Sequence, residues 1–220
     1  MDVMVRTSDD PVGEAAAALA SAIRGTLPDR QYVTVAVPGG SALEAWPRAA
    51  EDLGEALERV RLTWVDERCV PVGDALSNRG QTHRCTEKRA GGELPLWLDG
   101  ETEHAAVARV RAGFEAWGGA LDVSLLGMGP DGHIASLFPN RPWAGDVVMH
   151  ISNSPKPPPR RMSLTLSMLA TARSSILVAT GESKRDALVA LITGDPTLPA
   201  TGLPGLTVFT DLDLASGSTT

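Results

Sequence analysis

One stretch, LLGMGPDGHIASLFP at residues 125–139, decides how the rest of this sequence is interpreted. An apolar run at 121–126, predicted to be a buried strand, ends abruptly in glycines, a proline, an aspartate and a histidine. Glycine lets the backbone turn sharply and approach a ligand closely. Histidine titrates near neutral pH and can exchange protons with a substrate. His133 is therefore a candidate catalytic residue, although this stretch alone leaves open an ordinary glycine-rich loop with a surface histidine.

Short apolar runs alternate with amphipathic segments along the chain. The runs predict strands at 32–37, 62–65, 121–126, 147–151, 175–179 and 206–209. Helical spacing predicts helices at 12–27, from 41 onward with Pro47 limiting or bending the helix, and at 102–117, 164–172 and 182–192. We expect a polar, turn-like segment at 71–82, and a first strand near residue 32 with one helix before it. This alternation predicts an α/β fold, with a mainly parallel sheet covered by helices on both faces, in a Rossmann-like three-layer single domain over residues 1–220.

Composition narrows the classes of function. The chain has 220 residues, of which 43% are hydrophobic and 21% charged, as in a globular domain. The formal net charge of −7 argues against nucleic-acid binding but allows a small anionic substrate. We recognise no secretory signal peptide and no apolar run long enough to cross a membrane. Cys69 and Cys85 form no disulfide framework, so we expect a reduced, cytoplasmic protein. The oligomeric state stays open, with a monomer favoured.

Four polar clusters each follow a predicted strand: PGGS at 38–41, DER at 66–68, GMGPDGH at 127–133 and GESK at 181–184. In parallel sheets ligands bind at the carboxyl ends of the strands, which share one edge. We therefore expect the clusters to converge on one pocket. Taken singly, each has a plainer interpretation, namely a tight turn capped by Ser41, a surface charge triplet or a solvated lysine.

The chemistry of the clusters suits an anion. Two glycines and Ser41 at the start of a helix expose N–H and hydroxyl groups that can bind phosphate. In the DER cluster, an acid can orient another group while the guanidinium of Arg68 holds an oxyanion. The proline-rich tract at 154–159 is stiff, so it would hold Arg161 at a fixed distance from a phosphate. Lys184 follows a strand beside a glycine, where it can reach the same group.

In this order and spacing, the clusters resemble the 6-phosphogluconolactonase family. The likeness covers nearly the whole chain and depends on five motifs. They are PGGS at 38–41, DER at 66–68 with Val70-Pro71 and Ser77-Asn78 after it, the stretch 127–139, SPKPPP at 154–159 followed by Arg161 and Leu164-Thr165, and Gly181-Glu182-x-Lys184. Each motif alone is moderately specific, and the set is highly specific.

The resemblance implies hydrolysis of 6-phospho-D-glucono-1,5-lactone to 6-phosphogluconate in the oxidative pentose phosphate pathway. It implies that His133 is the general base that activates water and that Arg68 steadies the substrate or the oxyanion. Asp66 and Asp131 would shape the polar site. Phosphate binding is assigned to Gly39, Gly40, Ser41, Arg161 and Lys184. The expected partner is a phosphorylated sugar lactone, and the scheme needs no cofactor and no metal.

Two alternatives stay open. The first is a glucosamine-6-phosphate deaminase, because the deaminases and the 6-phosphogluconolactonases belong to one larger group. Deaminases, however, have a glutamate where this chain has Phe138. Ring opening and isomerisation need that extra acid–base group, so Phe138 favours the lactonase. The second alternative is a sugar-phosphate sensor without catalysis. Such proteins normally carry a DNA-binding segment, and only one helix is expected before the first strand.

Overall fold

A seven-stranded sheet runs through the molecule, and every neighbouring pair of its strands is parallel. The computed structural model describes residues 3–143 and 145–214. In spatial order the strands are β1 (Met4–Thr7), β10 (Leu206–Thr210), β9 (Ser174–Val178), β6 (Val123–Gly127), β2 (Val33–Val37), β3 (Val60–Trp64) and β5 (Gly92–Leu94). The interior strand β2 is buried along its whole length, as expected for a parallel strand covered on both faces.

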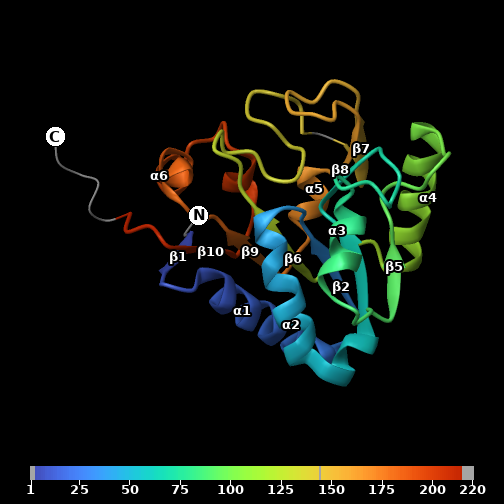
Figure 1. Cartoon of the computed structure of the whole chain (residues 1–220), viewed down its shortest axis with the longest axis horizontal. Helices are drawn as coiled ribbons and strands as arrows, with labels where there is room; N and C mark the ends of the chain where they lie inside the picture. Colours follow the sequence, from blue (N-terminus) through green and yellow to red (C-terminus); the bar gives the residue numbers. More distant parts are fainter. Residues whose placement is uncertain (1–2, 144, 215–220) are drawn as a thin grey trace.

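Helices cover both faces of the sheet, so the expected α/β architecture is confirmed. In Figure 1, α1 lies below the strands β1, β10 and β9, and α6 lies above them. The helices are α1 (Pro11–Thr26), α2 (Ala45–Leu53), α3 (Asn78–Cys85), α4 (Glu103–Ala116), α5 (Leu166–Leu169) and α6 (Arg185–Ile192). Short 3-10 turns add η1 (Leu27–Asp29), η2 (Ser41–Glu44), η3 (Gly54–Arg59), η4 (Glu182–Lys184) and η5 (Pro199–Gly202). No helix within the described ranges is long and apolar enough to span a membrane.

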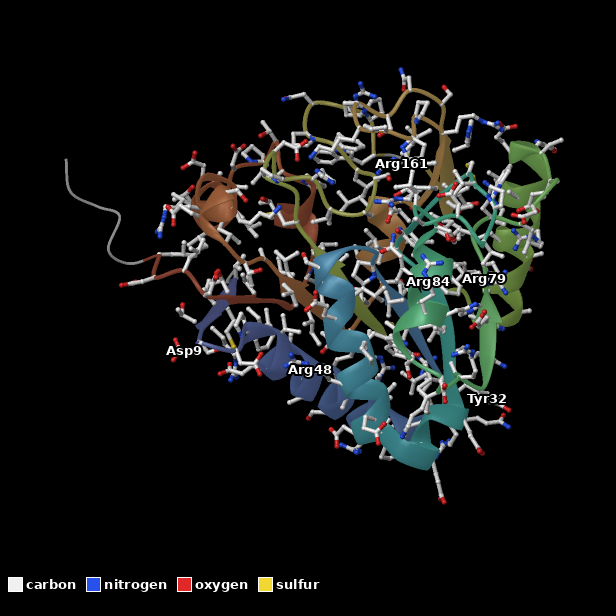
Figure 2. All side chains as sticks on the ribbon, in the orientation of Figure 1. Asp9, Tyr32, Arg48, Arg79, Arg84 and Arg161 are labelled. Carbon is white, nitrogen blue, oxygen red and sulfur yellow. The ribbon has the colours of Figure 1, made fainter. Side chains whose placement is uncertain are left out.

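The order of the strands creates a crevice between β2 and β6. After β2 the chain moves outward to β3, whereas after β6 it moves the opposite way to β9. Connections that leave neighbouring strands in opposite directions open a gap at the carboxyl ends, where such folds bind ligands. Figure 2 shows Arg161 at the end of the molecule opposite Tyr32, the residue that precedes β2. The crevice therefore lies at the Arg161 end.

A second, antiparallel sheet covers this end of the molecule. It consists of β4 (Asp66–Arg68), β8 (Arg161–Leu164) and β7 (Val148–Ile151), with β8 in the middle. The register pairs Arg68 with Arg161. The expected helix at 164–172 is wrong over most of its length, because its first residue ends β8 and α5 spans only Leu166–Leu169.

Three further expectations differ from the structure. The first strand is β1, far before residue 32, and it is a strand because it pairs with β10. The turn-like segment at 71–82 is helical from Asn78 onward, because Ser77 caps α3 by accepting a hydrogen bond from the backbone N–H of Gly80. The helix expected from residue 41 onward starts as the 3-10 turn η2 and becomes α2 only at Ala45, with Pro47 in the first turn, where a proline is tolerated.

Candidate active site

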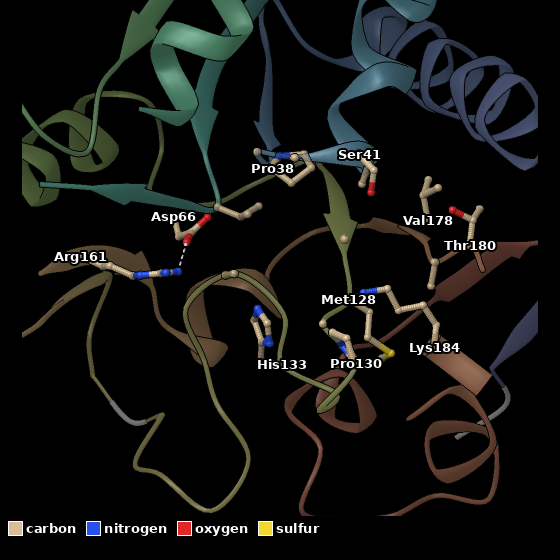
Figure 3. Close-up of a pocket in the computed structure, with 18 of the residues that line it drawn as sticks. Pro38, Ser41, Asp66, Met128, Pro130, His133, Arg161, Val178, Thr180 and Lys184 are labelled. Carbon is tan, nitrogen blue, oxygen red and sulfur yellow. Dashed lines mark ion pairs between the residues drawn. The ribbon is translucent and has the colours of Figure 1, made fainter. Parts of the chain in front are cut away.

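A cavity of about 240 Å³ lies at the carboxyl ends of the strands. The structure brings together on it almost all of the residues that the sequence assigns to the site. Its polar lining includes Gly39, Gly40, Ser41, Asp66, Arg68, His133, Arg161 and Lys184. Asp131 is not among the lining residues but contacts His133 directly. Figure 3 shows His133 between Arg161 on one side and Lys184 on the other.

His133 is held by a carboxylate on one ring nitrogen. Its Nδ1 lies 2.5 Å from Oδ1 of Asp131. A carboxylate accepts a hydrogen bond, so Nδ1 carries the proton and Nε2 is the free basic nitrogen of the neutral ring. No described residue hydrogen-bonds to Nε2. This is the arrangement that a histidine general base requires.

A lysine from the proline-rich loop shares the same carboxylate. Nζ of Lys156 lies 3.2 Å from Oδ1 of Asp131 and 3.4 Å from Nδ1 of His133. Burial raises the pKa of Asp131, but the hydrogen bonds and charges of His133 and Lys156 outweigh it and lower that pKa to about 2. Asp131 is therefore a carboxylate at any physiological pH.

Phe138 stacks on the imidazole of His133. The ring centroids are 4.7 Å apart with an interplanar angle of 29°, and Phe138 is buried. Burial lowers the pKa of His133, and the charge of Lys156 adds to that effect, whereas Asp131 and Asp66 act in the opposite direction. The net pKa falls below its usual value, so His133 is neutral and able to accept a proton near pH 7.

Asp66 and Arg161 form a buried pair on the opposite wall. Nη1 of Arg161 lies 3.8 Å from Oδ2 of Asp66, the contact marked in Figure 3. Ser136 donates to the same carboxylate oxygen at 2.6 Å and accepts from Arg161 at 3.3 Å. Asn78 donates from Nδ2 to the other oxygen of Asp66 at 2.9 Å. Both oxygens of Asp66 are thus engaged by the protein itself.

Arg161 also closes the proline-rich loop. Its Nη2 donates to the carbonyl oxygens of Lys156 and Pro157 at 3.1 and 3.0 Å, and its Nε donates to Pro158 at 3.1 Å. The loop was expected to hold Arg161 in place. The contacts show that Arg161 holds the loop, and only Nη1 faces away from it.

Two neighbours in the DER cluster have different environments. Glu67 is buried and accepts hydrogen bonds from the backbone N–H groups of Asn78 and Arg79 at 2.7 and 2.8 Å, so it caps α3. Arg68 lines the cavity and donates from Nη1 to the carbonyl of Leu76 at 2.8 Å. Its Nε is buried and has no hydrogen-bond partner among the described residues. Arg68 therefore brings a positive charge to the cavity wall.

The glycine-rich loop after β2 is held against α3. A Cβ at Gly39 would lie 1.9 Å from Oδ1 of Asn78, so glycine is required there by a protein contact. The N–H of Gly40 donates to Oε1 of Gln81 at 3.0 Å. Ser41 does not cap the following turn, because Gly40 is the N-cap. The Ser41 hydroxyl stays free of any partner among the described side chains.

Lys184 is a cation without a partner in the part of the chain that the structure describes. It lies at the end of η4 and lines the cavity next to the loop after β2. Burial lowers its pKa, and the charge of nearby Lys156 lowers it further. An unpaired, partly buried ammonium group on a cavity wall suits an anionic ligand.

Sequence reasoning gave no role to four residues that shape this site: Ser136, Asn78, Lys156 and Trp143. The first three belong to motifs that carry the resemblance, so position in a motif was the available signal. Trp143 donates from Nε1 to the carbonyl of Phe138 at 2.7 Å, which anchors the residue that stacks on His133. No sequence pattern indicates that contact.

Comparison with known proteins identifies relatives along nearly the whole chain. The sequence model of the glucosamine-6-phosphate isomerases/6-phosphogluconolactonase family matches residues 6–208. A 6-phosphogluconolactonase of Mycobacterium leprae is 34% identical over 216 residues, which cover 89% of this chain and 87% of that protein.

Solved structures share the fold. A 6-phosphogluconolactonase of Thermotoga maritima superimposes with a TM-score of 0.83 at 23% identity, covering 95% of this chain and 99% of that one. A monomeric glucosamine-6-phosphate deaminase superimposes with a TM-score of 0.78 at 18% identity, covering 98% and 99%. The fold is therefore common to lactonases and deaminases, and only the residues of the site can separate the two activities.

Proposed function

Because the chain belongs to the glucosamine-6-phosphate isomerase/6-phosphogluconolactonase family, we propose that it hydrolyses 6-phospho-D-glucono-1,5-lactone to 6-phosphogluconate. This reaction is the second step of the oxidative pentose phosphate pathway. We propose further that residues 1–220 act as one domain of this kind. A cytoplasmic location and a monomeric state stay predictions.

One observation carries the proposal: Asp131 fixes His133 at Nδ1, and His133 lines the same cavity as Lys184, which has no partner among the described residues. In the proposed reaction Nε2 of His133 takes a proton from water, and the oxygen of that water attacks the lactone carbonyl. The bond between the carbonyl carbon and the ring oxygen then breaks, the imidazolium of His133 gives its proton to the departing oxygen, and the open-chain acid is released. Asp131 stabilises the imidazolium that forms.

Charged groups on both sides of His133 fit the rest of the substrate. Arg68 lines the same cavity, and its positive charge supports a role in stabilising the oxyanion that develops on the carbonyl. Lys184, Ser41 and the backbone at Gly39 suit the phosphate. A phosphate role for Gly40 stays a prediction, because its N–H already donates to Gln81. The phosphate role of Arg161 stays a prediction, and its contacts leave Nη1 as the only group that could serve it.

Phe138 supports a lactonase over a deaminase. Its buried ring packs on His133 at the position where the deaminase chemistry needs a carboxylate. A lactone needs only an activated water and a stabilised oxyanion, and neither requires a second acid at this place.

The test is hydrolysis of freshly generated 6-phosphogluconolactone, produced by oxidation of glucose 6-phosphate and corrected for uncatalysed ring opening. We expect His133→Ala to lower kcat about 10²–10⁴-fold with the fold retained. His104→Ala, an exposed histidine of α4, is the matched control and should keep wild-type activity.

Three outcomes would overturn the assignment. A near-native kcat in His133→Ala would show that His133 is not the general base. Release of ammonia from glucosamine 6-phosphate identifies a deaminase. Binding of 6-phosphogluconate without any lactone hydrolysis identifies a sensor.

A further inference from the structure

Lys156 occupies an unusual position for a lysine beside a general base. Its ammonium group and Nδ1 of His133 both lie within hydrogen-bond distance of one oxygen of Asp131. The ammonium group of Lys156 and the N–H of His133 therefore share the same acceptor. When His133 accepts a proton, its new positive charge stands beside Lys156, at 3.4 Å in the structure, and is disfavoured by it.

The backbone of Lys156 is fixed, while its side chain is free to move. Its carbonyl accepts from Nη2 of Arg161 and its N–H donates to Oγ of Ser154. The side chain is 40% exposed, and a lysine has a flexible four-carbon stem. The ammonium group can therefore leave Asp131 without any movement of the loop.

An anion on the cavity would attract this ammonium group. Lys184 lies close enough for its charge and that of Lys156 to repel each other. A dianion placed between the two lysines would remove that repulsion. It would also draw Lys156 away from Asp131, which would then be left to His133 alone.

We propose that Lys156 is a positioning residue that keeps the His133–Asp131 pair weakly basic until the phosphate of the substrate draws its ammonium group away. The inference rests on the proposed function, because it needs a phosphorylated substrate. Binding of the phosphate then raises the proton affinity of the base at the moment when water must be deprotonated. A lactone without phosphate binds without triggering this change.

The charged groups around His133 define the controls. Asp131 and Lys156 contact its ring, and Asp66 acts on it from the opposite wall. Arg68, Arg161 and Lys184 line the same cavity. The face of the imidazole that is stacked lies against Phe138, which carries no charge. Lys156 thus contacts the imidazole, whereas Lys184 lines the cavity and has no described contact with the imidazole, which makes it the matched control.

The experiment is a titration of the His133 ring protons by NMR, in the wild type, Lys156→Met and Lys184→Met. The chain has 4 histidines, so the His133 signal is identified by its loss in His133→Asn. Sulfate serves as the probe, because it keeps both charges throughout the titration, and sodium chloride holds the ionic strength constant. No lactone is present, so the result is independent of whether the protein proves to be a lactonase.

Without sulfate, we expect Lys156→Met to raise the midpoint of His133 by about one pH unit. Lys184→Met should keep the wild-type midpoint, and Lys156→Arg should restore it. With sulfate, the wild-type midpoint should rise toward that of Lys156→Met, and the rise should be much smaller in Lys156→Met.

The proposal is overturned if Lys156→Met titrates like the wild type without sulfate, or if Lys184→Met shifts the midpoint equally. It is also overturned if sulfate moves the midpoints of the wild type and Lys156→Met by the same amount, because Lys156 then stays on Asp131. Circular dichroism of each variant shows that the fold is retained.

Discussion

The guanidinium group of Arg161 lies 3.8 Å from the carboxylate of Asp66, and the two side chains are only 4% and 7% exposed. Ser136 bridges them with its hydroxyl. The three residues come from β8, β4 and the loop after β6, so one buried polar cluster joins three segments of the site. Asp66 and Arg161 thus offset each other's charge within the wall of the cavity.

Arg161→Met should therefore destabilise the protein. It leaves the Asp66 carboxylate buried without its cation, and breaking a buried pair in this way costs about 3–5 kcal/mol. Equilibrium unfolding in urea measures the loss. Arg160→Met is the control, because Arg160 is about half exposed and pairs with Glu103 at the surface, where the effect should be about 0–1 kcal/mol. Equal losses in the two variants would contradict the buried cluster.

Asp131→Asn should move the pH dependence of activity to lower pH. His133 acts as a base only when neutral, so kcat/KM rises with pH through the pKa of His133. Asp131 raises that pKa by hydrogen bonding and charge, and its removal lowers the pKa further below the usual value. The maximal rate should also fall, though by less than in His133→Ala.

A pH profile of kcat/KM for Asp131→Asn checks both effects. Asp52→Asn, which alters a surface pair with Arg24, is the control and should leave the profile unchanged. If the acid limb of Asp131→Asn lay at higher pH than that of the wild type, Asp131 would not raise the pKa of His133.

Phe138→Leu should shift the same profile in the opposite direction. Burial is the main cause of the lowered pKa of His133, and the stacked ring of Phe138 supplies part of that burial. A smaller side chain admits water, so the pKa should rise toward its usual value and the acid limb should move to higher pH. Phe114→Leu, in the buried face of α4, should destabilise the protein comparably without moving the limb. If the pH profiles of kcat/KM were identical for the wild type and Phe138→Leu, the ring of Phe138 would not lower the pKa of His133.

Gly39→Ala should damage both stability and activity. The new Cβ would lie 1.9 Å from Oδ1 of Asn78, which is fully buried and hydrogen-bonded to Asp66. Overpacking of this kind costs about 1–3 kcal/mol. At Gly73 the same change meets no atom within 4 Å, so Gly73→Ala should alter the free energy of unfolding by no more than about 0.5 kcal/mol. Thermal unfolding and the lactone assay together compare the two variants.

The main sheet was predictable from sequence because its strands are apolar and buried. The runs at 33–37 and 123–127 are mainly apolar and almost entirely buried, which is the pattern of interior parallel strands. β1 and β5 lie at the edges and are short, so no such run indicates them. β4 consists of three charged residues and becomes a strand only by pairing with β8.

The helix α3 shows why local patterns are insufficient. Its sequence, NRGQTHRC, has no apolar stripe, and it begins where Ser77 and the buried Glu67 satisfy its first backbone N–H groups. Glu67 lies in the strand β4, so this cap is a contact between two separate elements. Helix propensity cannot report a partner that is distant in sequence.

The site was predictable to the extent that its residues follow strands. His133, Asp66, Arg68 and Lys184 reach one cavity for that reason. What each side chain contacts there was not predictable. The clamp of Arg161 on the proline-rich loop and the position of Lys156 on Asp131 depend on side-chain geometry across segments.

The pairing of β1 with β10 has a consequence for synthesis of the protein. The hydroxyl of Thr7 donates to the carbonyl of Leu212, 205 residues further along the chain. A ribosome adding about 5–20 residues per second needs about 10–40 s to make that length. The strand β1 therefore stays unpaired while the rest of the chain is synthesised. It can pair with β10 at the edge of the sheet only after translation has passed residue 210.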